Sequence, residues 1–199
     1  MITLDIEQHT EEWYSARRGI PTASGFSKIV TSKGEPSKQA KKYMYQLAGE
    51  RVAGSSEEGF KSLYMNRGNE VEAEARAYYE LITGNTVKQV GVVYKNDEKL
   101  FSCSPDGLVA DEGGIQIKCP SMAVHVEYLI NGKLPTDYFV QMQGELFVTE
   151  RKWWDFVSYY PCLNPLIIRV ERDDSFISKF EPELIKFCKE LDIVTEKIR

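Results

Sequence analysis

The fold of this chain is decided by two short stretches near its middle, Ser104-Pro105-Asp106-Gly107-Leu108 and Gly114-Ile115-Gln116-Ile117-Lys118-Cys119-Pro120. The first places an aspartate on a Pro-Asp-Gly turn, and the second is an apolar strand that carries a glutamine and a lysine two residues apart. Alternate side chains of a strand lie on the same face, so Gln116 and Lys118 point the same way while the two isoleucines pack. We therefore expect Asp106, the amide and the amine to converge.

This convergence has a chemical meaning. A carboxylate and an amide oxygen can bind a hard divalent cation, and an ammonium group beside them can act on a water that attacks a phosphodiester. The arrangement resembles the PD-(D/E)xK nuclease core, with Gln116 where that pattern has an acid. The short pattern alone leaves a second interpretation open, a turn aspartate and a strand with a solvated polar face. A lysine in a strand that otherwise looks buried is costly without a partner, which favours function.

Length and composition describe an ordinary globular protein. The 199 residues suit one domain over 1–199, and 42% hydrophobic with 28% charged residues is a typical composition. The net charge of −5 argues against a generic nucleic-acid coat protein but not against a nuclease, whose phosphate contacts are local. Candidates for such contacts lie in the N-terminal third: Arg17, Arg18, Lys28, Lys33, Lys38, Lys41 and Lys42.

The cysteines and histidines offer little support for other chemistries. The four cysteines are scattered without a CxxC pair, which indicates reduced thiols rather than a disulfide framework or a zinc site. With only two histidines, a histidine-based metal site or a Ser-His-Asp triad is poorly supported. We find no signal peptide and no apolar run of membrane-spanning length, so we expect a cytoplasmic protein without a membrane partner.

Apolar periodicity and turn residues predict alternating helices and strands. Helices are expected from Thr10, which precedes an acidic first turn, and then over 26–30, 36–52, 68–81, 121–131, 138–148 and 175–197. Strands are expected over 87–94, 100–103, 108–110, 114–118, 153–160 and 166–171. This order predicts an α/β or α+β fold with a central mixed sheet flanked by helices.

Other candidate site residues each have an ordinary structural alternative. Glu72 is one of several carboxylates on its helix, although Gly68 near the helix start would allow close packing on the sheet. Arg17, followed by Thr22 and Ser24 at the start of a short helix, forms either an anion cradle or a capped turn with an exposed arginine.

The helix over 138–148 and the aromatic strand after it raise similar alternatives. Gln141 and Gln143 face different sides of the helix, so at most one enters the site, and Gln141 shares its face with Glu145. The aromatic cluster over 153–160 is expected to form core rather than a base-stacking platform.

Taken in order, these pieces resemble the phage lambda exonuclease family, the YqaJ-like viral recombinase exonucleases of the PD-(D/E)xK superfamily. The similarity covers nearly the whole chain, and its ordered set of motifs is more specific than any one of them. The matching positions are Trp13, Arg17, Gly19, Thr22, Ala23, Ser24, Gly68, Glu72, residues 104–108, 118–120, 141–143, 159–161 and 170–173.

The resemblance implies 5′→3′ degradation of one strand of linear double-stranded DNA with Mg²⁺, for which Mn²⁺ substitutes. It also implies work in recombination beside a single-strand annealing protein, in a phage or prophage protein of a bacterial host. The best-known member of the family is a ring-shaped trimer, so a homo-oligomer is expected here.

The resemblance also implies roles at the metal. Asp106 would bind it, the side chain of Gln116 would occupy the second acidic-ligand position, and Ile117 would offer its backbone carbonyl. Lys118 would be the catalytic lysine, and Glu72 would add a helix carboxylate.

Around the metal, the resemblance places residues that contact DNA. Gln141 would line the catalytic site. Arg17, with Thr22 and Ser24, would hold the terminal 5′-phosphate, and Ser104 would contact DNA in the same region.

Gln116 leaves two interpretations open. A glutamine keeps an oxygen that can bind Mg²⁺ but loses a full negative charge, so activity is expected to be weakened or abolished. Either it is natural, as in some nucleases of the superfamily, or it is an engineered Glu→Gln change, which the fit of every other motif position favours.

Three competing classes remain: a structure-selective endonuclease, a catalytically silent module that binds DNA ends, and a small metal-dependent hydrolase.

Overall fold

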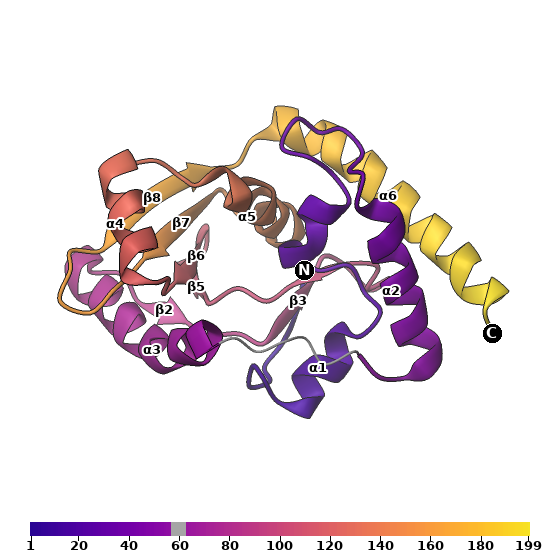
Figure 1. The fold of residues 1–199 in the computed structure, drawn as a ribbon, viewed down its shortest axis with the longest axis horizontal. Helices are drawn as coiled ribbons and strands as arrows, with labels where there is room; N and C mark the ends of the chain where they lie inside the picture. The colour runs from indigo at the N-terminus through magenta and orange to yellow at the C-terminus, as the bar shows by residue number, and fades with distance from the viewer. Residues whose placement is uncertain (57–62) are drawn as a thin grey trace.

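The computed structural model describes the chain outside residues 57–62, and its side chains outside residues 57–70 (Figure 1). The helices are α1 (Glu11–Arg17), the 3₁₀ helix η1 (Ala23–Lys28), α2 (Ala40–Ala53), α3 (Leu63–Thr83), α4 (Met122–Asn131), α5 (Thr136–Thr149) and α6 (Asp174–Lys197). The strands are β1 (Ile2–Leu4), β2 (Val87–Lys88), β3 (Val92–Tyr94), β4 (Ser102–Cys103), β5 (Gly107–Val109), β6 (Gly113–Lys118), β7 (Trp153–Ser158) and β8 (Leu166–Glu171).

The described strands form two sheets. The larger has the order β2-β5-β6-β7-β8, with β6 and β7 parallel and the other pairs antiparallel, and the smaller has the order β1-β3-β4. The predicted mixed sheet flanked by helices is confirmed. The second sheet was not expected, and the single strand predicted over 87–94 was wrong, because β2 and β3 belong to different sheets. The break includes Gly91, where a β-carbon would lie 2.3 Å from the carbonyl oxygen of Ile6.

The two faces of β6 meet different helices. Ile115 and Ile117 pack with Ala75 and Tyr79 of α3. The alternation along the strand turns Gln116 to the opposite face, where α5 lies. Gln116 and Lys118 therefore lie on the face of the sheet that α5 covers.

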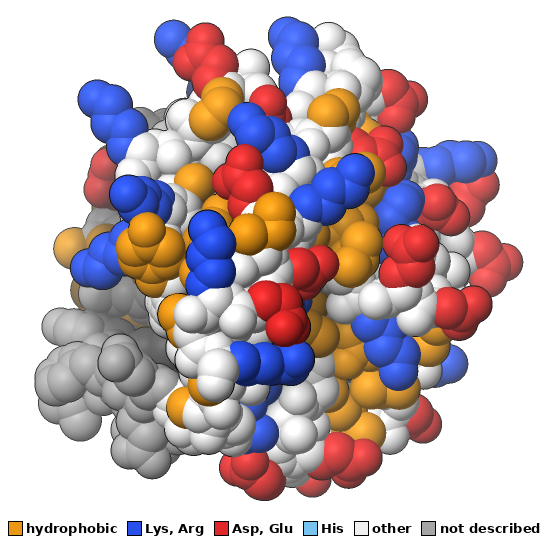
Figure 2. Space-filling model, turned by 90° about the vertical axis from the view of Figure 1, so that its right-hand side faces the viewer, with side chains coloured by type: hydrophobic (Ala, Val, Ile, Leu, Met, Phe, Trp, Pro, Cys, Tyr) orange, Lys and Arg blue, Asp and Glu red, His pale blue; other side chains and the backbone are white. Residues whose placement is uncertain are grey.

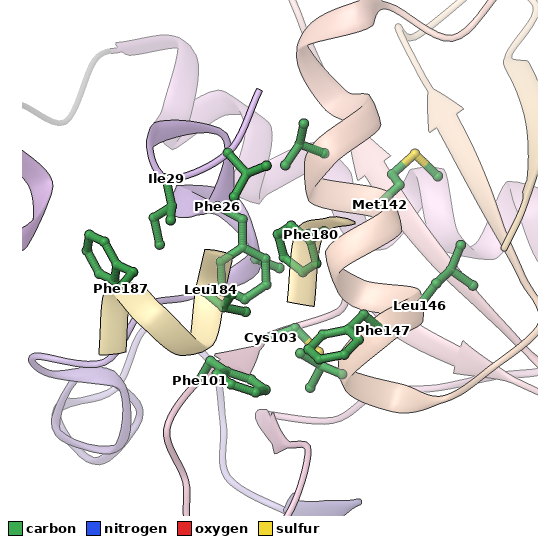
Figure 3. Packing of buried hydrophobic residues seen from close by; sticks show 14 of the residues in the cluster. Phe26, Ile29, Phe101, Cys103, Met142, Leu146, Phe147, Phe180, Leu184 and Phe187 are labelled. Atoms are coloured by element: carbon green, nitrogen blue, oxygen red, sulfur yellow. The ribbon is translucent and has the colours of Figure 1, made fainter. Parts of the chain in front are cut away.

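The main core joins α5 to η1 and α6. Phe180 lies between Phe26 and Phe147, with ring centroids 5.3 and 5.5 Å away (Figure 3). Trp154 and Phe156 of β7 are fully buried against the same cluster, so the expectation of an aromatic core in this strand is confirmed. This packing fixes α5 over the sheet and sets the position of the polar side chains it carries.

Some predicted boundaries were wrong. The helix expected over 36–52 begins at Ala40, because Pro36 instead forms a β-bridge with Val30. The short helix expected over 26–30 is the 3₁₀ helix η1, and Thr22 before it makes no capping bond with its side chain. The expected packing at Gly68 lies outside the described side chains.

The surface beside α2 and α6 carries both signs of charge. Figure 2 shows acidic and basic side chains interspersed on this face, without a continuous basic patch. The described residues contain no helix with the length and apolar character needed to cross a bilayer. The four cysteines form no disulfide.

Candidate active site

Asp106 lies at the open edge of β6. Strand β5 pairs with β6 only as far as Ile115, and the carboxylate of Asp106 takes the next place along that edge. Its Oδ2 accepts a hydrogen bond of 2.5 Å from the backbone N–H of Ile117 and another from Nε2 of Gln116. The two motifs of the sequence therefore meet side by side.

The backbone of β6 turns Ile117 toward the same carboxylate. The carbonyl of Lys118 faces β7, where it accepts from the N–H of Tyr159 at 2.9 Å. Backbone groups of successive strand residues point to opposite sides, so both the N–H and the C=O of Ile117 face Asp106. The carbonyl of Ile117 is thus available on the side where a metal ligand is needed.

The segments around Asp106 are held by two long side chains. Nε2 of Gln8 donates to the carbonyls of Val90 and Pro105, each at 2.9 Å, which fixes the residue before the aspartate. Nη1 of Arg151 donates to three carbonyls of the β5–β6 turn, at 2.7 to 3.2 Å. Local sequence gave no signal for either contact.

A chain of side-chain hydrogen bonds leads from Asp106 into α5. Gln116 is 3% exposed, and its Oε1 accepts from Nε2 of Gln141 at 2.9 Å. The same Nε2 donates to Oε1 of Glu145 at 3.0 Å. The expected common face of Gln141 and Glu145 is confirmed, whereas the buried Gln143 bonds to the backbone at Glu171 and Asp173 instead.

The two carboxylates at the ends of this series of hydrogen bonds, Asp106 and Glu145, have raised pKa values. The pKa of Asp106 is raised to about 7, mainly by burial and partly by the charge of Glu72, while Lys118 and the N–H of Ile117 oppose the shift. Burial likewise raises the pKa of Glu145 to about 8, with Asp106 adding to the rise. A site that resists negative charge in this way is stabilised by a bound cation.

The remaining predicted residues at the metal position lie nearby. Glu72 forms an ion pair of 2.5 Å with Arg76, one helical turn later. Lys118 is half-buried, with Nζ 5.5 Å from the ring centroid of Tyr138. Arg76 and Lys118 both lower the pKa of Asp106, because their positive charges stabilise the ionised carboxylate.

These residues fit a hard divalent cation. Asp106, Glu72, the amide oxygen of Gln116 and the carbonyl of Ile117 are all oxygen donors, the class that Mg²⁺ prefers. The orientation of Gln116 differs from our expectation, because its nitrogen rather than its oxygen faces Asp106. An amide N–H group is a favourable hydrogen-bond partner for a carboxylate.

A second site surrounds Arg17. Arg17, Thr22 and Ser24 line one cavity of about 230 Å³, together with Tyr43 and Lys28. The Thr22 and Ser24 hydroxyls lie 3.2 Å apart. Burial lowers the pKa of Arg17 to about 10, and its Nε has no hydrogen-bond partner in the described residues.

Trp13 connects this cavity to the metal site. The guanidinium carbon of Arg17 lies 3.8 Å from the Trp13 ring centroid, and Nε1 of Trp13 donates to Oγ of Ser104 at 3.1 Å. Ser104 precedes Asp106 by two residues, so Trp13 links Arg17 to the segment that carries Asp106.

Our sequence reasoning did not assign Glu145, Trp13 or Arg76 to the site. The first two had usable signals: Glu145 follows Gln141 by four residues, and Trp13 precedes Arg17 by four on one helix.

The buried His125 lies elsewhere, bonded to Ser158 at 2.7 Å and to the carbonyl of Asn164 at 3.1 Å.

Comparison with known proteins identifies the family of this chain. The sequence profile of the YqaJ-like viral recombinase domain family matches residues 12–152. The chain belongs to this family. An alkaline exonuclease from Laribacter hongkongensis, LHK-Exo, is 38% identical in sequence with a TM-score of 0.86, over 95% of this chain and 96% of that one. LHK-Exo has also been solved in complex with dAMP, with the same similarity.

Two more distant matches add less to this YqaJ-like chain. A phage-related exonuclease from Haemophilus somnus 129PT has a TM-score of 0.70 at 18% identity, over 90% and 96% of the two chains, which shows a shared fold. Uncharacterized protein R354 of Acanthamoeba polyphaga mimivirus is 25% identical over 164 residues, or 76% of this chain, but the chain spans only 29% of that protein. The resemblance to the viral recombinase exonucleases and the PD-(D/E)xK-type fold are confirmed, and together they support a DNA exonuclease.

Proposed function

We propose that this protein is a Mg²⁺-dependent 5′→3′ exonuclease that degrades one strand of linear double-stranded DNA for recombination. The observation that carries the proposal is the contact of Asp106 with Gln116 and Ile117, which places the turn aspartate beside the strand of Lys118. The raised pKa of that aspartate and the cavity that Arg17, Thr22 and Ser24 line support it.

Asp106, Gln116, Glu72 and the carbonyl of Ile117 would hold the cation, with Mn²⁺ as a substitute for Mg²⁺. When bound, such an ion supplies Lewis-acid stabilisation of the charge that develops on the scissile phosphate. Nζ of Lys118 orients the attacking water and offsets negative charge on the phosphate. The water oxygen bonds to phosphorus as the bond to O3′ breaks, which yields a 5′-mononucleotide and a shortened strand with a new 5′-phosphate.

The guanidinium of Arg17 and the hydroxyls of Thr22 and Ser24 would hold that terminal 5′-phosphate. A buried guanidinium nitrogen without a partner is costly, and a phosphate oxygen would satisfy it. Ser104, bonded to Trp13, would contact the nucleotide between the two sites. Gln141 would line the metal site and hold Gln116. The dAMP complex of LHK-Exo supports recognition of a deoxynucleoside monophosphate by this fold.

A catalytically silent DNA-end-binding module is the second candidate, because the amide nitrogen of Gln116 occupies the side of Asp106 where an acid would supply a ligand.

The proposed setting is the cytoplasm of a bacterial host, beside a single-strand annealing protein and as a homo-oligomer. Light scattering on the purified chain tests the proposed trimer.

One nuclease assay separates the candidates. Linear duplex labelled on one strand at its 5′ or 3′ end, and covalently closed plasmid, are incubated with the protein with and without Mg²⁺. We expect mononucleotide release from the 5′ end of linear duplex only with Mg²⁺, and an intact plasmid. Plasmid cleavage would indicate an endonuclease, and a gel shift of linear DNA without digestion would indicate the silent module.

Matched variants tie the activity to the site. Asp106→Ala and Lys118→Met are expected to lower digestion at least about a hundredfold, or about 2.7 kcal/mol in the barrier. Asp97→Ala and Lys133→Met remove the same charges from exposed positions and should retain activity. Equal loss in both pairs would contradict the assignment of the site.

A further inference from the structure

The hydrogen bonds between Asp106 and Glu145 have a direction. Nε2 of Gln116 donates to Asp106, and Nε2 of Gln141 donates both to Oε1 of Gln116 and to Oε1 of Glu145. Gln116 and Glu145 are 3% and 1% exposed, so solvent does not compete for these bonds. In this arrangement, both amide nitrogens serve as donors toward carboxylate oxygens.

A divalent cation shared with Asp106 requires the opposite arrangement at Gln116. The amide oxygen must face the cation, so the side-chain amide has to turn and exchange its nitrogen and oxygen. The nitrogen of Gln116 then faces Gln141, which can accept only if its own amide turns as well. The two glutamines must therefore change orientation together.

The second turn creates a requirement at Glu145. Once the oxygen of Gln141 faces Oε1 of Glu145, an ionised carboxylate would place two acceptors against each other. A neutral carboxylic acid removes the conflict, because its O–H donates to Gln141. The chain of bonds thus accommodates a cation only when Glu145 offers a hydrogen-bond donor.

The surroundings of Glu145 favour that donor. Its Oε2 is buried without a partner in the described residues, and burial raises its pKa to about 8. The hydrogen bond from Gln141 and the charge of Lys118 lower this pKa, whereas the charge of Asp106 contributes to its rise. The thiol of Cys103 on β4, whose own pKa burial raises, also lies within its electrostatic influence.

We propose that Glu145 is a positioning residue whose neutral acid group donates to Gln141, so that both amides turn and the oxygen of Gln116 faces a divalent cation at Asp106. This inference rests on the proposed metal-dependent function. It gives Gln116 a way to serve as a ligand where the related motif has an acid, because the donor two bonds away fixes the orientation of the amide.

The test is Mg²⁺ binding by the full chain without DNA at pH 7, followed through the backbone N–H signal of Ile117 in NMR titrations. Glu145→Gln retains a donor and an acceptor of the same shape and should bind Mg²⁺ within about threefold of the unmodified chain. Glu145→Met lacks the donor and should bind at least about tenfold more weakly, equivalent to about 1.4 kcal/mol. Equal affinities in all three proteins would overturn the inference.

A double-substitution cycle separates positioning from general damage to the fold. In a Gln116→Glu background, residue 116 offers oxygens in either orientation and needs no turned amide. Glu145→Met should then change Mg²⁺ affinity less than about twofold. A loss of the same size in both backgrounds would overturn the inference.

A measurement on the unmodified chain covers the case in which Glu145→Met does not fold. Saturation with Mg²⁺ should shift the side-chain NH₂ signals of both Gln116 and Gln141. A shift at Gln116 alone would overturn the inference. If Mg²⁺ shifts no NMR signal and linear DNA is not digested, both this inference and the proposed function fail. If linear DNA is digested but the side-chain NH₂ signal of Gln141 does not shift, only this inference fails.

Discussion

At the residue scale, Gln116 is the position where one side chain has the clearest structural consequence. Its amide bridges Asp106 and Gln141 through opposite ends, a geometry that a carboxylate could only partly reproduce. Glutamate would accept from Gln141 but repel Asp106 until a cation arrives. An acid at this position therefore binds metal more strongly than an amide, because it adds a full negative charge.

Gln116→Glu is expected to increase Mg²⁺-dependent digestion of 5′-phosphorylated linear duplex at least about tenfold, or about 1.4 kcal/mol in the barrier. The added charge strengthens cation binding, and Nε2 of Gln141 remains a suitable donor to the new carboxylate. Initial rates at saturating Mg²⁺ measure the effect. Equal rates would show that the amide is already a competent ligand.

Arg17→Ala is expected to weaken the preference for 5′-phosphorylated over 5′-hydroxyl ends at least about tenfold, since charge-assisted hydrogen bonds contribute about 1.5 to 3 kcal/mol. Competition between the two kinds of duplex end measures this preference. Arg17→Lys should retain part of it, and Arg199→Ala removes a charge at an exposed position as the control. An unchanged preference would remove Arg17 from the phosphate site.

At the element scale, the buried strand β6 begins with two glycines, because the rings of two neighbouring tryptophans leave no room for a side chain at these positions. A β-carbon on Gly114 would lie 2.3 Å from the ring of Trp154, which is fully buried, and one on Gly113 would lie 2.1 Å from the ring of Trp153. The glycines therefore let β7 approach β6 closely, and this parallel pair extends to Lys118.

Gly114→Ala is expected to lower the free energy of unfolding by about 1 to 3 kcal/mol, because the added methyl overpacks a rigid site. Gly49→Ala is the matched control, since its β-carbon meets no atom within 4 Å and alanine favours the helix interior by about 0.5 to 1 kcal/mol. Urea denaturation measures both. Similar unfolding free energies for the two variants would contradict this account of the strand.

At the scale of the whole molecule, the buried acids make stability depend on pH. The pKa of Glu145 rises from 4.5 to about 8 on folding, so the folded protein holds a proton that the unfolded chain loses between these values. The free energy of unfolding therefore falls as pH rises through this window, and the raised pKa of Asp106 acts in the same direction.

Glu145→Gln is expected to flatten this dependence in metal-free protein, by at least about 1 kcal/mol between pH 5 and pH 8, because each pKa unit of difference contributes about 1.4 kcal/mol. Urea denaturation in EDTA at these two pH values gives the difference. A variant whose unfolding free energy falls as steeply as that of the unmodified chain would show that Glu145 does not titrate in this range.

Much of the organisation was predictable from local sequence. Thr10 caps α1 with its side chain, and α6 begins within one residue of its expected start, because capping residues and apolar periodicity act over a few residues. The contact of Asp106 with the strand of Gln116 was also predictable. The short strand that follows Asp106 is close in sequence to the strand of Gln116, and the two pair antiparallel. Local signals failed for the strand over 87–94, whose halves were divided between sheets by contacts with β1 and β5.

The sequence by itself determined the family, the fold class and most of the helices and strands, because these depend on short-range patterns and on an ordered set of motifs. It also supplied the candidate side chains of the site. Only the tertiary structure decided how the side chains pair. The turn of Gln116 away from an expected ligand geometry, the buried acid of Glu145 behind it and the contact of Trp13 with Ser104 join segments distant in the chain. Burial and hydrogen-bond direction arise from that packing, and no local pattern encodes them.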